Sequence, residues 1–461
     1  MVSKDSEERR WSITFLKSDQ NIFLSLIISL YAENCDFCNN CSDNKNCYLI
    51  FNTRRSEDCI SCERMVGCRD SIDCMDMSDS ELCFDCVSCN RCYNVQSSRE
   101  SDDCQESMFL MNCRSCTDCF GCVNLRHKRF CIFNEQKTEQ EYRTFLTEAK
   151  MSSFVARSIW QQKAEAFWQR HPRPHAVLNM VEDVSGNLLF ECRDVHDSFL
   201  VRKGEHLHYC SFVFDNVRNA CDYTAYGDQA ELVYETARCG NQIFRLLFSH
   251  YCYESCSELQ YCSFCTGCRQ CFGCIGLRKK QYCILNKQYT KEKYEALVPQ
   301  IIKHMRAAGE WGEFFPMQDS IFAYNHSMAH RYFPMSKEEA CAHGLPWYEE
   351  KPVANAGNAL APEQIPDSVP SEDTTMLLNS ASSARAFSVT AQELRRYRKL
   401  EAPLPRLTYD ERMEKRAGII GGMTLFDRTC AKTGKPIRTT IPPEAPWIVW
   451  DKEVYEEEFS S

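Results

Sequence analysis

The sequence predicts a mainly β protein with helices, in which two cysteine-rich β-solenoid lobes are followed by a small C-terminal module. The first observation is a ladder: steps of nine residues from Cys41 to Cys131 meet eleven residues that are all apolar or cysteine, and eight of them are cysteine. The second is an internal duplication, since the run 113–126 recurs 152 residues later as 265–278. The third is the uneven placement of cysteine, with 18 of the 32 in 35–131 and 12 in 192–283.

Within the first lobe, each step of nine offers a bend followed by small inward side chains. The residues that precede the ladder positions, such as Asp58, are turn formers. Two nine-residue halves make an 18-residue coil, and cysteine pairs 18 apart are frequent, among them Cys41/Cys59 and Cys104/Cys122. A repeat of this kind is typical of a β-solenoid, whose coils stack and hydrogen-bond to one another. We therefore expect these four cysteines to point inward and pairs 18 apart to lie on adjacent coils.

The chain is long enough for two to four domains. The expected order is an N-terminal cap segment, lobe 1, connecting helices, lobe 2, a helix with an aromatic extension, a Pro/Ala/Asn linker and the C-terminal module. Their respective bounds are 1–34, 35–137, 138–180, 186–289, 290–350, 351–376 and 377–461. Helical spacing of apolar residues predicts helices within 138–170, 290–309 and 391–400. The ladder of lobe 2 changes phase, which indicates bulges or longer corners.

Charge and the N-terminus bear on compartment and partners. The net charge is −10, which argues against a general affinity for nucleic acid or anionic lipid. The N-terminus lacks the basic region of a secretory signal, and the apolar stretch 22–32 is too short to span a bilayer as a helix. We therefore expect a cytoplasmic protein whose thiols stay reduced.

Three runs with the spacing C-x2-C-x2-C-x2-C are the candidate metal sites, since thiolates at this density can surround a tetrahedral zinc ion. The candidate ligands are Cys83, Cys86, Cys89 and Cys92 in the first run, Cys113, Cys116, Cys119 and Cys122 in the second, and Cys265, Cys268, Cys271 and Cys274 in the third. Buried cysteine also behaves as a small hydrophobe, so plain core packing is the favoured alternative. Disulfides are a third alternative, which the expected compartment disfavours.

No catalytic motif accompanies these runs: G-x-S-x-G, the P-loop and a G-x-G-x-x-G between strand and helix are all missing from the sequence. His206 and His208 alternate as on one strand face, where a polar surface pair is favoured over metal ligands. His326 and His330 are four apart, but in an aromatic segment without the H-E-x-x-H pattern. The sequence therefore predicts a non-catalytic structural or interaction scaffold with a protein partner. The alternative is a thiol/redox-active or metal-handling protein.

The phrases CRSCTDCFGCVNLRHKRFC and CTGCRQCFGCIGLRKKQYC, with GEWGEFFP after them, resemble the uncharacterised cysteine-ladder, zinc-ribbon-tailed proteins of ultrasmall candidate-phylum bacteria. The resemblance covers most of 30–455 and implies a cytoplasmic protein whose C-terminal zinc knuckles carry paired C-x2-C elements. This chain departs from that pattern, because Cys430 keeps one cysteine while Thr433 stands in place of its partner. We therefore expect a degenerate zinc-ribbon-like module, held together by Trp447, Trp450 and Tyr455.

Overall fold

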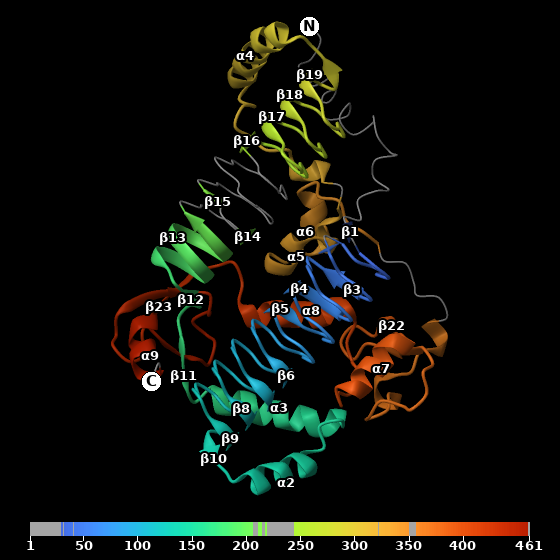
Figure 1. Cartoon of the computed structure of the whole chain (residues 1–461), viewed down its shortest axis with the longest axis vertical. Coiled ribbons are helices and arrows are strands. Elements are labelled where there is room, and N and C mark those ends of the chain that lie inside the picture. The colour runs from blue at the N-terminus through green and yellow to red at the C-terminus, as the bar shows by residue number, and fades with distance from the viewer. Residues whose placement is uncertain are drawn as a thin grey trace.

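The computed structural model describes residues 29–30, 32–39, 41–205, 211–213, 217–218, 244–320, 322–349 and 356–459 of the chain. It has mixed α and β structure, with many short strands in small sheets and helices packed along them (Figure 1). Most of the predicted N-terminal cap, 1–34, lies outside the described residues. Among the residues described, no helix combines the length and the apolar composition that crossing a bilayer requires.

The first stack of strands is built almost entirely from parallel neighbours (Figure 1). Its strands are β1 (Ser29–Leu30), β2 (Cys41–Ser42), β3 (Tyr48–Phe51), β4 (Ile60–Val66), β5 (Met75–Ser78), β6 (Tyr93–Gln96), β7 (Gln105–Met108), β8 (Thr117–Phe120), β9 (Arg129–Ile132) and the antiparallel β10 (Glu135–Gln136). Paired residues are 12 apart, as in Tyr48 with Ile60 and Cys119 with Cys131. Isolated parallel bridges between the strands keep the same spacing. The chain therefore completes one turn every 12 residues.

Each turn has four sides, because the backbone changes direction at every third residue. In one turn, Leu82, Asp85, Ser88 and Arg91 all have φ between 50° and 56°. This left-handed conformation is costly for most residues and is tolerated best by Gly, Asn and Asp, which explains why Asp and Asn recur at these corners. The residue after each of these corners points inward and is buried.

The prediction of an 18-residue coil is wrong, because adjacent turns are related by 12 residues. Inward positions recur every three residues, and 9, 12 and 18 are all multiples of three. A step of any of these lengths therefore leads from one inward residue to another, so the cysteine ladder does not determine the length of a turn. The nine-residue step has its own physical basis, since the Cys59 thiol donates a hydrogen bond to the backbone oxygen of Cys68 at 3.5 Å. Cys41 and Cys59 are consequently not on directly paired positions. The prediction that Cys41, Cys59, Cys104 and Cys122 point inward is confirmed, since none is more than 2% exposed.

The interior of the first stack is narrow and holds four side chains per turn. In one turn the four interior side chains are the cysteines of 83–92. In another turn they are Leu110 and the smaller Ser107, Cys113 and Cys116. Interior hydroxyls are hydrogen-bonded to the backbone, and the Ser98 Oγ accepts from the Leu110 amide at 2.9 Å. Close packing in so small a section favours side chains of serine and cysteine size.

Helices cover two adjacent sides of the first stack. α2 (Glu139–Ala149) and α3 (Phe154–Trp168) pack on a cluster that includes Phe109 and Phe120. α7 (Ala391–Lys399) packs beside Ile60 and Ile72, and α8 (Tyr409–Ile420) packs beside Met75. The helices predicted within 138–170 and 391–400 are therefore present. Apolar rows mark the covered sides, and the other two sides are mostly polar.

The second stack follows β11 (Pro172–Pro174) and β12 (Leu178–Asn179). It comprises β13 (Glu182–Glu205), β14 (Ser211–Val213), β15 (Val217–Arg218), β16 (Phe244–Leu247), β17 (Ser257–Gln260), β18 (Arg269–Phe272), β19 (Gln281–Ile284) and β20 (Lys287–Gln288), and α4 (Lys291–Ala308) closes it as predicted. The register is 12 between β17 and β18 but 13 between β16 and β17, because Glu254 and Ser255 both adopt positive φ and lengthen one corner. This corner is one of the predicted phase slips, while those in 206–243 lie largely outside the described residues.

The C-terminal segment spreads along the first stack instead of forming a separate module (Figure 1). Besides α7 and α8 it contains β21 (Met376–Asn379), β22 (Ala386–Val389), β23 (Phe426–Thr429), β24 (Pro436–Thr439), β25 (Ile448–Trp450) and α9 (Lys452–Phe459). β25 pairs with β11, and Trp447 and Trp450 pack around the buried Cys430. Tyr455 reaches the first stack, where its hydroxyl donates to Asn124 at 2.5 Å.

The segment predicted as a linker, 351–376, is packed where the structure describes it. Ile365 is buried beside α7, and Asp367 accepts hydrogen bonds from the amides of Phe154 and Val155 at the start of α3, each at 2.9 Å. The aromatic extension before it contains η2 (Met317–Asp319), η3 (Tyr324–His326), α5 (Met328–Tyr332) and α6 (Lys337–Ala342), and η4 (Ala356–Asn358) and η5 (Pro362–Gln364) follow. Through Asp367, the segment 351–376 thus helps to fix α3 on the stack.

Candidate functional site

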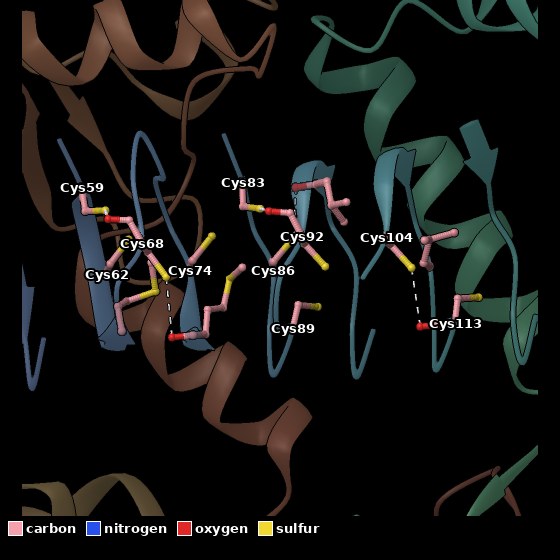
Figure 2. Close-up of a cluster of buried hydrophobic side chains, with 14 of the residues drawn as sticks. Cys59, Cys62, Cys68, Cys74, Cys83, Cys86, Cys89, Cys92, Cys104 and Cys113 are labelled. Atoms are coloured by element: carbon pink, nitrogen blue, oxygen red, sulfur yellow. Dashed lines mark hydrogen bonds between the residues drawn. The ribbon is translucent and has the colours of Figure 1, made fainter. Parts of the chain in front are cut away.

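The three cysteine runs line the interiors of the two stacks. All twelve cysteines are free thiols and none is more than 2% exposed. Figure 2 shows the run 83–92 together with cysteines of the turns before and after it, with the side chains directed into the interior. Successive members of a run lie on successive sides of one turn, because the backbone turns every third residue. The spacing C-x2-C therefore reflects the four-sided turn.

Each of the twelve thiols donates a hydrogen bond to the backbone oxygen two residues before it, at 3.3 to 3.6 Å. Many also reach the oxygen nine residues ahead, as Cys86 does with Val95 at 3.2 Å. A zinc ligand must be a thiolate and has no proton to donate. In this geometry the thiols satisfy backbone carbonyls inside the stack.

Burial opposes ionisation of most interior thiols. It raises the pKa of Cys68 and of Cys256 to about 12, and it holds the pKa of Cys113 well above its usual value. A few thiols accept hydrogen bonds from neighbouring thiols, and the bond from Cys104 lowers the pKa of Cys116. Reactive cysteines combine a low pKa with solvent access, and these cysteines have no such access.

One group of three possible metal ligands is present among the described residues: Asp183, Asp194 and His196. Their ligand atoms all lie within 4.8 Å of one another. None of the twelve candidate cysteines belongs to such a group. The His196 Nε2 lies 3.3 Å from Asp194 and 4.0 Å from Asp183, with 44% of its side chain exposed. This cluster lies on β13, and the sequence reasoning did not single out its two acids.

We expect protein purified without added metal to contain fewer than about one zinc ion per chain, and its fold to survive chelation, because the interior thiols already bond to carbonyls. Elemental analysis and circular dichroism before and after EDTA treatment measure both quantities. About two or more zinc ions per chain, with loss of strand and helix signal on chelation, would contradict the expectation.

The predicted pair of His326 and His330 does not form a common site. His326 packs against Tyr348 at a ring distance of 4.6 Å, whereas His330 packs edge-on against Trp347 at 5.6 Å. The predicted pair of His206 and His208 lies outside the described residues. These aromatic contacts give His326 and His330 separate packing roles.

A buried polar network that the sequence reasoning missed joins the C-terminal helices to the first stack. The Asp73 carboxylate, 2% exposed, accepts from the Tyr397 hydroxyl at 2.6 Å and from the Arg412 Nε at 2.8 Å. One turn further, Asp85 accepts from Arg416 at 2.6 Å. Burial, together with the Asp73 charge, keeps the pKa of Tyr397 well above its ordinary value. The partners are more than 300 residues apart in sequence, so no local signal relates them.

The sides of the first stack that none of the described helices covers carry a surface hollow of about 450 Å³. We call this surface the charged face, and its lining comprises Asp43, Lys45, Arg55, Ser56, Glu57, Gly67, Cys68, Arg69, Asp79, Ser80 and Glu81. Charges alternate along one row, where Glu57 lies 3.9 Å from Lys45 and 3.6 Å from Arg69. Gly67 contributes no side chain, and the Asp79 carboxylate occupies the space that a Cβ would fill there. Only residues of the first stack line this hollow, among those that the structure describes.

The chain matches no family model and no curated protein sequence. Among solved structures, it is similar to a "putative acetyltransferase" from Desulfovibrio desulfuricans G20, with 9% identity over 52% of this chain and 62% of that chain and a TM-score of 0.11. It is also similar to the polySia-specific acetyltransferase NeuO, with 9% identity over 59% of this chain and 95% of that chain and a TM-score of 0.07. The chain thus spans less than two thirds of the first of these proteins. Likenesses at these scores carry no argument about fold or activity.

Proposed function

We propose that the protein is a non-catalytic interaction scaffold, in which stacked 12-residue turns form two β-solenoid lobes that present a surface to a protein partner. The observation that carries the proposal is the charged face. Helices and the C-terminal segment cover the apolar sides of the first stack, whereas no described element covers this hollowed face. Solenoids commonly bind partners along such extended surfaces.

The charged face has the properties of a specific protein-binding surface. Rows of side chains repeat on neighbouring turns ~4.8 Å apart, on a backbone that is paired on both sides. Arg55 and Glu81 form no ion pair with any residue that the structure describes, so their charges are available to a partner. Exposed charges contribute little to stability, but complementary charges on a partner give specificity and faster association.

The buried thiols weigh against the alternative of a thiol or redox enzyme. Their sulfur atoms lie inside the stacks and donate to backbone oxygens, so substrate has no route to them among the described residues. Among the described cysteines, Cys341 on α6 is the exposed one, and Cys35 at the start of the first stack is half-buried. A lone exposed cysteine is not a catalytic constellation.

The test is capture of a partner by the tagged full-length chain under reducing conditions. The variant Arg55→Glu/Arg69→Glu reverses two charges on the charged face, and Lys303→Glu/Lys415→Glu makes the same charge change on exposed positions of α4 and α8. We expect the first variant to lose the partner and the second to keep it. Equal capture by both variants would contradict the proposal, as would a partner held only through a mixed disulfide at one cysteine.

A further inference from the structure

The closing turns of lobe 2 carry a strong local excess of positive charge. Residues 269–293 contain seven basic residues and a single acid, Glu292, which gives a net charge of +6 in a chain whose net charge is −10. The basic residues are Arg269, Arg278, Lys279, Lys280, Lys287, Lys291 and Lys293. So large an asymmetry points to an anionic partner for this end of the molecule.

Lobe 1 supplies an internal comparison. The corresponding segment 152 residues earlier, 117–141, contains four basic and four acidic residues, so its net charge is zero. Its buried Asp118 pairs with Arg129 at 3.2 Å and with Arg143 at 2.9 Å. Lobe 2 has Gln270 at the position of Asp118. Both segments consist of two parallel strands, a hairpin and the start of a helix, in that order. Because the fold is the same, the excess of positive charge in 269–293 is a property of lobe 2 and is not required by the fold.

Four of the basic residues form what we call the basic patch: Arg269, Arg278, Lys279 and Lys280. Arg269 lies on β18, and the other three form the corner before β19 on the next turn. Lys279 stacks over Gly267, which offers no side chain to compete with it. All four residues are exposed, and none forms an ion pair with an acid in the part of the chain that the structure describes. The patch lies at the opposite end of the long axis from α2 (Figure 1).

The charge of the remaining chain limits the size of the partner. Subtracting +6 from −10 leaves −16 on the rest of the molecule. A long polyanion that touched the patch would extend over this acidic remainder, and exposed charges still interact within a Debye length of ~8 Å at physiological salt. A short anionic segment avoids that repulsion, and Arg and Lys bind carboxylates by charge-assisted hydrogen bonds.

We infer that the basic patch docks a short acidic segment of a protein partner. The inference rests on the proposed scaffold function, because it supplies the chemistry of part of the partner. The charged face and the basic patch are then two separate contact surfaces, one on each lobe.

The test uses the purified full-length chain and a fluorescein-labelled peptide of ten glutamates, with a neutral Gly-Ser peptide and a ten-nucleotide RNA as comparison probes. The variant Lys279→Gln/Lys280→Gln removes two charges from the patch. The matched control Arg114→Gln/Lys128→Gln removes two exposed charges from lobe 1. We expect the patch variant to bind the glutamate peptide about tenfold more weakly and the control to bind it as the unmodified chain does. Binding should also weaken as salt is raised, because the Debye length falls to ~3 Å at 1 M.

Absence of glutamate-peptide binding, or equal loss in both variants, would overturn the inference. Tighter binding of the RNA than of the peptide would also overturn it and would assign the patch to nucleic acid. If the peptide fails while the charged-face experiment still captures a partner, the patch inference alone is wrong. If the peptide binds and the charged-face variants do not differ, the proposed function alone is wrong.

Discussion

Replacing Asp73 with alanine is expected to lower the free energy of unfolding by about 3–5 kcal/mol. Breaking one side of a buried ion pair leaves the other charge without compensation, and losses of about this size follow. Here the stranded groups are the Arg412 guanidinium, 9% exposed, and the Tyr397 hydroxyl, both of which donate to Asp73. Denaturant unfolding measures the change, and limited proteolysis reports whether α7 and α8 leave the stack.

Asp79→Ala is the matched control for this variant. Asp73 and Asp79 both occupy left-handed corners, with φ of 58° and 48°, so alanine imposes a similar backbone cost of about 1–2 kcal/mol at each. Asp79 is exposed and takes no part in the buried network. The difference between the two variants therefore isolates the network. Equal destabilisation would show that the corner conformation, and not the docking of the C-terminal helices, accounts for the effect.

Acidification is expected to destabilise lobe 2 through His250. Its ring lies among Phe264, Phe314 and Phe315 at centroid distances of 5.2 to 6.0 Å, and burial lowers its pKa to about 4 from an ordinary 6.5. Ser263 is the polar neighbour, with its Oγ 3.5 Å from the ring Nδ1. The folded state therefore excludes a proton that the unfolded state binds below pH 6.5.

The contribution of His250 is fully present above about pH 6.5 and is lost as the pH falls toward 4. The loss is about 1.4 kcal/mol per pH unit over that window, or about 3 kcal/mol in total. Unfolding of the unmodified chain and of His250→Phe at several pH values measures it, since phenylalanine keeps the aromatic surroundings and cannot titrate. We expect a shallower pH dependence in the variant by this amount. Parallel pH profiles for the two proteins would show that His250 is not the responsible group.

The parts of the fold that local pattern determines were predictable from sequence. The helices α2, α3, α4 and α7 fall within predicted segments, because their caps and apolar spacing are local features. The inward direction of Cys41 and Cys104 was predictable as well, since a cysteine ladder with regular turn formers requires one buried row. These features depend on residues only a few positions apart.

The length of a turn was not predictable in the same way. Every inward residue of lobe 1 shares one three-residue phase, so the pattern of Cys59, Cys68 and Cys86 fits several turn lengths equally well. What selects 12 is the backbone, which needs four left-handed corners to close a turn and bring Tyr48 beside Ile60. That choice depends on hydrogen bonds between turns, which leave no separate mark in the sequence.

The buried network and the two candidate surfaces depend on distant segments, which explains why sequence reasoning did not find them. Asp85 lies at a left-handed corner, as many residues of the stack do, and only the fold brings Arg416 next to it. The run 83–92 resembled a metal site because its spacing matches that of zinc ligands, although the four-sided turn produces the same spacing. Charge counts over the two copies would have revealed the basic segment 269–293 from sequence alone.

Each side of a turn is three residues long, and this length restricts which insertions and deletions the stack can accommodate. Insertion of 12 residues lengthens a stack by ~4.8 Å and returns all later side chains to their original sides. Insertion of three residues instead moves every later row by one side, which would carry apolar residues such as Met75 away from the helix that covers them. A single extra residue is absorbed within one corner, as at Ser255, and the following turns regain their register. Viable length variants of this architecture should therefore differ by whole turns or by isolated corner residues.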